Sequence, residues 1–351
     1  MYDYLVVGLG LAGISFCETL EEHGKTFKVI SDASQKASQV AAGLYNPVIL
    51  KRFTMAWKAA EQMELVEPFY SRLEEKLGVK LDHKIPVWRR FASIEEQNAW
   101  FEASDRPGLD NFLSTTLIEN KNPHLDAPFG FGLVKHTGWV DTAMLIASYA
   151  KYLGQKSLWQ EEHFDFTKLK INHDHIVYKN MEARHIVFAC GYGLKQNPYF
   201  NYLSLAGTKG ELLTIKAHDY KENNVIKSAV FTIPLGNDLY RVGATYKWKD
   251  KTNVPTESAR EELLEKLRTF LKCEFEVVEH VAGIRPTVVD RRPLVGRHPK
   301  HANLFVLNGF GSRGVLIAPY ASKQLYNAIE LGQQLDPELD IRRFTKKYYS
   351  N

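Results

Sequence analysis

The chain has 351 residues, of which 44% are hydrophobic and 25% are charged. This length allows two domains with a large core, and the composition is ordinary for a globular protein. The formal net charge of +4 permits an anionic ligand. Without a long block of like charge, however, it gives no support for a nucleic-acid partner.

The cysteines and the N-terminal segment allow a prediction of the cellular compartment. Cys17, Cys190 and Cys273 lie far apart without C-x-x-C spacing, so we expect no disulfide framework and no metal site. The apolar opening YLVVGLGLAGISFC is too short and too rich in glycine to span a bilayer. Asp3 stands where a signal peptide carries positive charge. We therefore expect a cytoplasmic protein with no membrane span.

Residues 3–31 predict a compact βαβ unit of strand (YLVVG), helix (AGISFCETLEEHG) and strand (FKVIS). Gly8-x-Gly10-x-x-Gly13 lies where the first strand turns into the helix. Gly8 permits the tight turn, Gly10 lets a pyrophosphate approach the backbone at the helix N-terminus, and Gly13 allows close packing of helix on strand. The motif in this setting predicts a dinucleotide site.

The second strand of such a unit ends in an acidic residue that holds the adenosine ribose. Here Ser31 occupies that position and Asp32 follows one residue later, so the motif alone leaves NAD, NADP and FAD open. Residues 38–47, SQVAAGLYNP, come next. The small pair Ala42 and Gly43 suits close backbone approach to a ligand, but an ordinary loop would also contain such residues.

The middle of the chain changes character several times. Helical spacing of apolar residues predicts a helix over 57–77, and Gly78 is its expected stop. Residues 80–135 give no regular pattern, whereas HIVFACG (185–191) is typical of a buried strand that runs into a glycine turn.

Antiparallel sheet is predicted for residues 209–248, with a turn at Gly236-Asn237-Asp238. After it, Ser258-x-x-Glu261 is expected to cap a helix.

A second motif of the same spacing, Gly309-Phe-Gly311-Ser312-Arg313-Gly314, follows the strand LFVL and precedes the helix APYASKQLYNAIE. The two motifs therefore predict either two bound dinucleotides or one dinucleotide that is contacted from both ends of the sequence, unless a motif is only a structural turn. The layout predicts an α/β nucleotide-binding domain with an inserted antiparallel-sheet domain. We assign 1–84, 136–206 and 283–351 to the first domain, and 85–135 and 207–282 to the second.

Arg285 lies in the apolar stretch HVAGIRPTVVDRRPLVG. An arginine between Ile284 and Pro286 is not expected to be freely exposed. Its planar fork suits a bidentate carboxylate ligand, and it equally suits a structural ion pair.

Together these segments resemble the D-amino-acid oxidase and glycine oxidase family of FAD enzymes over nearly the whole chain. The FAD fingerprint, the segment SQVAAGLYNP, HTGWVDT (136–142), IVFACG and TKGELLTI occur in the family's order. The family more often has two glycines where Ala42-Gly43 stands. FTIPLGNDLYRVGAT is similar to the glycine oxidase hairpin. AGIRPTVVDRRPLVGRHP and NGFGSRGVLIAP resemble the C-terminal signature, the most specific part of the likeness.

This resemblance implies a Rossmann-like FAD-binding domain of the glutathione-reductase type and a single FAD. The first glycine motif would hold the pyrophosphate. The second would present its helix N-terminus to the flavin ring, where reduction places negative charge. Sarcosine oxidase relatives attach flavin through a cysteine, and Gly283 is the nearest match here, so we expect non-covalent FAD. The implied cofactor-binding residues are Gly8, Gly10, Gly13, Ser31, Asp32, Ala42, Gly43, Ala189, Gly191, Gly309, Gly311, Ser312, Arg313 and Gly314.

The resemblance further implies oxidation of a C–N bond in a small amine with a carboxylate, such as glycine, a D-amino acid or an N-alkyl amino acid. Arg285 would anchor the carboxylate, and oxygen or a quinone would accept the electrons. Arg241 would place positive charge near the flavin, unless it is a surface strand residue. Glycine oxidase has a tyrosine where Phe231 and Thr232 stand, so Tyr246 or Tyr45 would have to supply a hydroxyl.

Three other functions stay open on the sequence alone. The Gly-Ser-Arg-Gly segment also resembles the oxidase domain of the bifunctional enzyme that modifies the tRNA wobble uridine, although no methyltransferase domain is added here. A flavoprotein without catalytic activity would share the same cofactor motifs. A nicotinamide dehydrogenase would share the first glycine motif but would not be yellow.

Overall fold

A sheet with a parallel centre carries the N-terminal and C-terminal parts of the chain in the computed structural model, which describes residues 1–349. Its strand order is β11-β2-β1-β14-β13-β12, and β21 pairs with both β14 and β20. The strands are β1 (Tyr2–Val7), β2 (Phe27–Ser31), β11 (Trp159–Glu161), β12 (Leu169–Ile171), β13 (Ile176–Tyr178), β14 (Met181–Phe188), β20 (Leu294–Arg297) and β21 (Leu304–Asn308).

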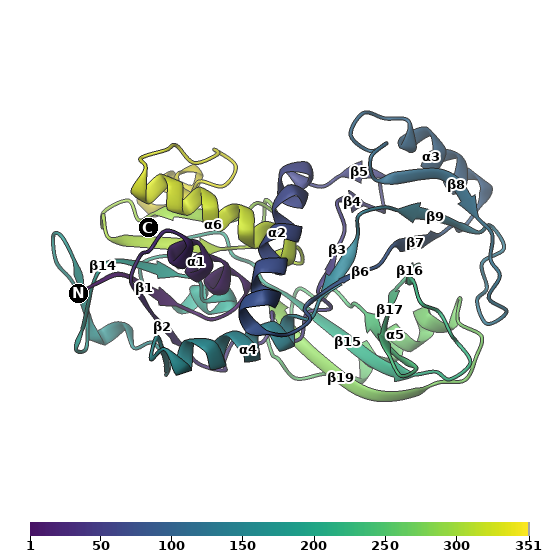
Figure 1. The fold of residues 1–351 in the computed structure, drawn as a ribbon, viewed down its shortest axis with the longest axis horizontal. Helices are drawn as coiled ribbons and strands as arrows, with labels where there is room; N and C mark the ends of the chain where they lie inside the picture. The colour runs from purple at the N-terminus through teal and green to yellow at the C-terminus, as the bar shows by residue number, and fades with distance from the viewer. Residues whose placement is uncertain (350–351) are drawn as a thin grey trace.

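Helices cover this sheet, and the N-terminal end of the chain lies beside it (Figure 1). Helix α6 packs against α1 and α2 through one large apolar core. The α-helices here are α1 (Leu11–Glu22), α2 (Ala59–Leu77), α4 (Thr142–Gln155), α6 (Gly314–Glu330) and α7 (Thr345–Tyr349). The 3-10 helices are η1 (Phe166–Lys168), η2 (Gly191–Gln196) and η3 (Ile341–Phe344).

The second large sheet forms the other half of the molecule (Figure 1). Its order is β19-β15-β18-β17-β16-β7-β9-β8, antiparallel except between β16 and β7. The strands are β7 (Val87–Arg90), β8 (Leu113–Ile118), β9 (Phe131–Val134), β15 (Thr208–Lys216), β16 (Val225–Lys227), β17 (Phe231–Gly236), β18 (Leu239–Gly243) and β19 (Glu276–Arg285). Helix α5 (Glu257–Arg268) covers one face, where Leu263 and Leu267 pack with Leu213 and Val242. Helix α3 (Ile94–Ser104) packs beside β8.

Two small sheets lie between the large ones. One has the order β3-β10-β6, and the other pairs β4 with β5. Their strands are β3 (Leu44–Tyr45), β4 (Val48–Ile49), β5 (Thr54–Met55), β6 (Asp82–Lys84) and β10 (Gly138–Val140). Gly43 precedes β3 with φ +69°, and a Cβ there would lie 1.8 Å from the Val140 carbonyl oxygen. Only glycine fits this close approach of two backbones.

The predicted βαβ unit and the helix that stops at Gly78 are confirmed; Gly78 has the left-handed φ of +67°. The prediction that residues 80–135 are irregular is wrong, because β6, β7, α3, β8 and β9 lie there. The predicted cap of α5 is also wrong. Thr256 is the N-cap residue, and its hydroxyl donates to Glu211 at 2.9 Å instead of capping the helix.

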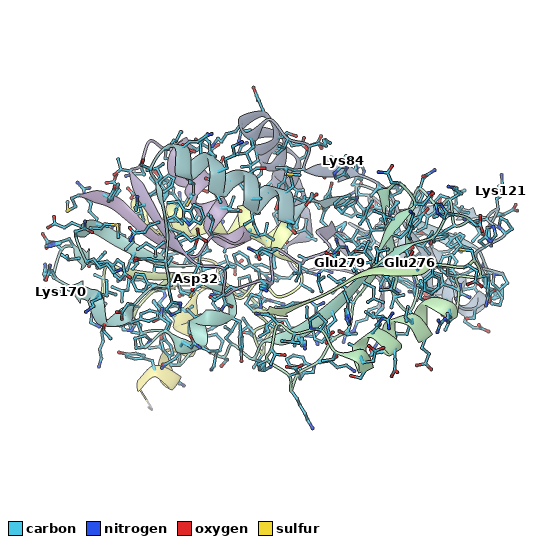
Figure 2. The ribbon with its side chains drawn as sticks, turned by 90° about the horizontal axis from the view of Figure 1, so that it is seen from below. Asp32, Lys84, Lys121, Lys170, Glu276 and Glu279 are labelled. Atoms are coloured by element: carbon cyan, nitrogen blue, oxygen red, sulfur yellow. The ribbon has the colours of Figure 1, made fainter. Side chains whose placement is uncertain are left out.

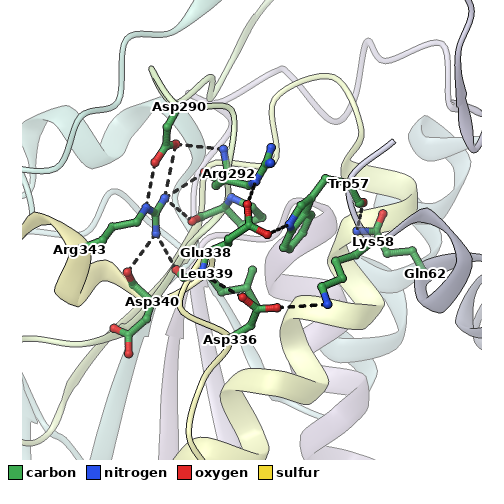
Figure 3. Close-up of polar contacts among 11 residues, drawn as sticks. Trp57, Lys58, Gln62, Asp290, Arg292, Asp336, Glu338, Leu339, Asp340 and Arg343 are labelled. Carbon is green, nitrogen blue, oxygen red and sulfur yellow. Dashed lines mark hydrogen bonds and ion pairs between the residues drawn. The ribbon is translucent and has the colours of Figure 1, made fainter. Parts of the chain in front are cut away.

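Ion pairs fix the C-terminal segment to the loop that follows β19 (Figure 3). The Arg343 guanidinium binds Asp290 at 2.9 Å, and Arg292 binds Glu338 at 2.6 Å. Trp57, just before α2, donates to the same Glu338 carboxylate at 2.7 Å. Residues 338–343 thus connect the loop after β19 with the segment just before α2. Within residues 1–349, no helix is long and apolar enough to cross a membrane.

We predict that Gly43→Ala destabilises the protein much more than Gly24→Ala. Both glycines have a left-handed φ, +69° and +65°, but nothing lies within 4 Å of a Cβ at Gly24. Gly24→Ala should therefore cost only the backbone strain, about 1–2 kcal/mol. Gly43→Ala adds a backbone clash and should cost at least about 3 kcal/mol. Thermal unfolding in the presence of excess FAD measures the loss of stability in both variants. Equal losses would contradict the close contact with Val140.

Candidate active site

A cavity of about 800 Å³ extends between the two large sheets and takes its walls from both. The turns after β1, β2, β14 and β21 line one part of it. Strands β15, β16, β17 and β19 supply residues to the other part. Parts of the chain that are far apart in sequence therefore contact the same space.

The first glycine turn lies at the carboxyl end of β1. Gly8 has φ +110°, and a Cβ there would lie 2.5 Å from the Ala189 carbonyl oxygen. A Cβ at Gly13 would lie 2.0 Å from the Gly8 carbonyl oxygen, so this glycine allows α1 to pack onto the turn. Gly10 is the N-cap of α1 and lines the cavity, whereas Gly13 does not. The N-terminus of α1 thus lies at the cavity, as an anionic ligand requires, and the N–H of Leu11 there donates to the Ser38 hydroxyl at 3.3 Å.

The second glycine turn opens on the same cavity. Gly311, Ser312, Arg313 and Gly314 line it, whereas Gly309, with φ +81°, supports the turn against Val288. A Cβ at Gly314 would lie 3.0 Å from the Leu11 side chain, so the N-termini of α1 and α6 are neighbours. Residues of both glycine motifs therefore line the same cavity.

Ser31 and Asp32 both line the cavity at the end of β2. The Ser31 hydroxyl accepts from Trp159 at 2.9 Å. Asp32 pairs with His163 at 2.7 Å and accepts from the Ser34 N–H at 3.0 Å. Burial raises the pKa of the Asp32 carboxyl, but the hydrogen bonds from Ser34 and His163 outweigh it and leave that pKa lowered. Asp32 is thus an anionic acceptor beside the cavity, and it is labelled in Figure 2.

Four further residues expected at the cofactor, Ala42, Gly43, Ala189 and Gly191, also line the cavity. Tyr45 does not, because it is buried and its hydroxyl donates to Asp82 at 2.9 Å.

Arg285 ends β19 and points into the cavity. Its guanidinium lies across Gly210 of β15, where a Cβ would come within 1.9 Å of Nη2. Nη1 donates to the Thr245 carbonyl oxygen at 3.1 Å, and the group lies 5.2 Å from the centre of the Tyr246 ring. Burial lowers the pKa of Arg285. No carboxylate among residues 1–349 pairs with Arg285, so the structural ion pair is not found there.

Two more cations face the cavity. The Arg313 guanidinium donates to the Asn46 carbonyl oxygen at 2.9 Å and has no carboxylate partner in the described chain. The Lys227 ammonium lies 5.8 Å from the centre of the Phe231 ring. Sequence reasoning missed Lys227 as a site residue. The available signal was its position two residues after buried Val225, which places both side chains on one face of β16.

The structure does not bring Arg241 to the cavity. Its guanidinium lies 3.5 Å from the Glu279 carboxylate of β19, which is labelled in Figure 2. Tyr246 is not among the residues that line the cavity either. Its side chain is 43% exposed and packs against Trp248, so it contacts Arg285 from the solvent side.

The donor set suits a bound dinucleotide. Two adjacent helix N-termini, close backbone approach and an acidic residue at the end of β2 match what a pyrophosphate and a ribose require. No group of three or more potential metal ligands occurs among residues 1–349.

Comparisons with known proteins agree with this geometry. Residues 3–327 match the family model described as FAD dependent oxidoreductase. Glycine oxidase of Bacillus subtilis is 22% identical, over 91% of this chain and 90% of that protein. The bifunctional protein MnmC of Azoarcus sp., which takes part in tRNA 5-methylaminomethyl-2-thiouridine biosynthesis, is 25% identical over 96% of this chain and 58% of its own length.

Solved structures show the same fold. Glycine oxidase from Bacillus cereus has a TM-score of 0.76 at 21% identity, covering 95% of this chain and 96% of that one. Iminodiacetate oxidase from Chelativorans sp. has a TM-score of 0.78 at 16% identity, covering 97% and 98%. The predicted fold class is confirmed. Because the family model spans nearly the whole chain, this protein belongs to the DAO family of FAD-dependent oxidoreductases.

Proposed function

We propose that this enzyme oxidises the C–N bond of a small amine or amino acid that carries a carboxylate. The observation that carries the proposal is Arg285, a partly buried guanidinium that faces the cavity without a carboxylate partner among residues 1–349. A charge that is partly removed from water and has no counterion is costly, so a carboxylate from the substrate is its natural partner. The similarity to glycine oxidases supports the same substrate class.

The cofactor would contact both glycine turns. The N–H groups at Gly10 and α1 would bind the FAD pyrophosphate, and Ser31 or Asp32 the ribose. The N-terminus of α6 at Gly314 would lie at the flavin, where its positive end stabilises added negative charge by up to about 2 kcal/mol. When bound, FAD supplies the two-electron acceptor.

Attachment of the flavin is proposed to be non-covalent. Gly283 has no side chain to form a bond. Cys190 lines the cavity, but burial raises the pKa of its thiol to about 12. A thiol with such a pKa is protonated at neutral pH and is a weak nucleophile.

The chain's own residues would orient the reacting bond. Arg285 would fix the carboxylate, and its position over Gly210 leaves the guanidinium little freedom. Apolar side chains such as Leu212, Phe231 and Leu50 line the same space and limit water around the α-carbon. Loss of a hydride from the α-carbon, with the nitrogen lone pair forming the C=N bond, would give an iminium ion. Water would hydrolyse this ion to a carbonyl compound and a protonated amine or ammonium, while the two electrons of the hydride go to the bound cofactor.

The similarity to MnmC favours one alternative, oxidation of a carboxymethylaminomethyl group on a tRNA uridine. Arg285 would bind the carboxylate of that group equally well. A salt-sensitive affinity for tRNA would favour this alternative.

The cytoplasmic location of the protein remains a prediction from the sequence.

Anaerobic mixing of purified protein with glycine, sarcosine, D-alanine, D-proline and L-amino acids tests the proposal. We expect at least one to bleach the yellow flavin. If no amine bleaches the flavin, the result would instead favour a flavoprotein without catalytic activity. Readmission of oxygen, or addition of a quinone, then shows which acceptor restores the colour.

We predict that Gly10→Val abolishes FAD binding. The new side chain would stand at the N-terminus of α1 where the backbone must meet the pyrophosphate. Flavin absorbance relative to protein absorbance measures the content. Gly154→Val is the control, because nothing lies within 4 Å of a Cβ there and it does not line the cavity. Fully yellow Gly10→Val protein would contradict this placement.

We also predict that acid or denaturant releases all the flavin from the wild-type protein. The supernatant after precipitation should contain the whole flavin absorbance. Colour that stays with the precipitated chain would reveal a covalent bond.

Arg285→Met should weaken substrate affinity at least about a hundredfold, equivalent to some 2.8 kcal/mol. Hydrogen bonds to a charged group contribute roughly 1.5–3 kcal/mol each, and two would be lost. FAD content should stay near normal. Arg285→Lys should recover part of the loss, because an ammonium lacks the planar fork. Stopped-flow flavin reduction gives the affinity.

Arg268→Met is the matched control, since Arg268 is exposed on α5 and does not line the cavity. Unchanged kinetics in Arg285→Met would overturn the assignment. Joint loss of flavin and fold would instead mark Arg285 as a structural residue.

A further inference from the structure

Lys227 is a second cation on the sheet that carries Arg285, and the proposed reaction does not use it. It ends β16 and lines the same cavity. The structure gives its ammonium no hydrogen bond and no carboxylate partner among residues 1–349. Its one described contact is the face of the Phe231 ring, 5.8 Å from the ring centre.

The strand register explains how Lys227 faces the cavity. Lys227 is paired with Phe231, Phe231 with Gly243, and Gly243 with Leu212, so these residues form one row across four strands. Directly paired residues share a face of a sheet. A Cβ at Gly243 would lie 2.1 Å from Leu212 and 2.9 Å from Phe231, so these two side chains fill the middle of the row.

Arg285 lies at the other end of this surface. Its guanidinium covers Gly210, which is two residues before Leu212 and therefore on the same face of β15. The cavity floor thus has a guanidinium at one end, an apolar strip of Leu212 and Phe231, and an ammonium at the other end. This pattern matches a ligand with an anionic group at each end and an apolar middle.

The strand order sets the spacing of the two cations. From Gly210 on β15, over which the Arg285 guanidinium lies, to Lys227 on β16 there are three strand steps. At about 4.8 Å per step these two strand backbones are roughly 14 Å apart, which sets the scale of the separation between the two cations. A charge-assisted contact of about 2.8 Å at each end leaves about 8 Å between the two anionic groups. A ligand with several carbons between its carboxylates spans this distance, and malonate does not.

The charged residues near Lys227 leave it protonated and without a counterion. Burial first, then the charges of Arg89 and Lys266, lower the pKa of Lys227 to about 8, so it is mostly protonated at pH 7. Arg89 is paired with Glu96 at 2.6 Å, and Lys266 with Glu262 at 2.6 Å. Both neighbours thus have their own counterions, and Lys227 is the cation that still needs one.

We propose that Lys227 is a specificity-determining residue that binds a second carboxylate of the substrate, at the end remote from Arg285. The substrate class is then a dicarboxylate amine, whose α-carboxylate contacts Arg285 and whose distal carboxylate contacts Lys227. The assignment of an amine substrate rests on the proposed function. Binding of a second carboxylate does not.

Calorimetric titration of the FAD-loaded protein at pH 7 tests the second carboxylate site directly. Pimelate is compared with heptanoate, which has the same length and one carboxylate. We expect pimelate to bind at least tenfold more tightly than heptanoate. Malonate is too short to reach both cations, so we expect it to show no such advantage over heptanoate. Equal affinity of pimelate and heptanoate in the wild-type protein would overturn the proposal without any variant.

Variants test whether Lys227, and not another residue of the cavity, binds the second carboxylate. Lys227→Met should remove the advantage of pimelate while heptanoate binds as before, and Lys227→Arg should keep it. Lys216→Met is the matched control, because Lys216 is exposed on β15 and does not line the cavity. It should leave the advantage intact. A preference for pimelate that survives Lys227→Met in protein with normal FAD content would overturn the proposal.

Flavin reduction distinguishes the role of Lys227 from the proposed C–N oxidation. N-alkylglycines are compared with the same amines carrying a terminal carboxylate, and we expect the carboxylate to improve apparent affinity at least tenfold. Reduction by both sets without this preference overturns the role of Lys227 and leaves C–N oxidation intact. Tight binding of pimelate without reduction by any amine supports the carboxylate site and overturns the proposed reaction.

Discussion

The whole site depends on one contact, the close approach of two backbones at the end of β1. Gly8 lies so near the Ala189 carbonyl oxygen that no side chain fits between them. Strands β1, β14 and β21 are parallel neighbours, so their carboxyl ends meet at one edge of the sheet. The turns after these strands, and the N-termini of α1 and α6, are thereby gathered around a single cavity. One elongated cofactor can then contact segments that lie about 300 residues apart in the chain.

Unpaired positive charges around the cavity are a second constraint. Arg285 and Lys227 lie on the sheet side and Arg313 lies in the second glycine turn, and none of them has a carboxylate partner among residues 1–349. Folded proteins normally pair cations that are removed from water, because an isolated one is costly. Such an arrangement is stable when an anionic ligand completes it. The same arrangement would select for negatively charged ligands as they enter the cavity.

The sequence predicted the features that local chemistry decides. The βαβ unit, both glycine turns and the left-handed Gly78 follow from neighbouring residues. Residues 80–135 escaped prediction because their short strands pair with distant segments, as β7 does with β16. Arg241 shares a strand with Gly243, but the sequence could not reveal its ion pair with Glu279 on β19. Lys227 went unnoticed because a lysine at a strand end normally lies in solvent.

The position of β14 has a consequence for synthesis of the chain. Ile186, Val187 and Phe188 pair with β1 on one side and with β21 on the other. The ribosome completes β21 more than a hundred residues after β14. Until then, the nascent chain exposes an apolar strand with one row of unpaired backbone groups. Such an edge is a template for association with other chains, so the last part of the sequence also protects the first from aggregation.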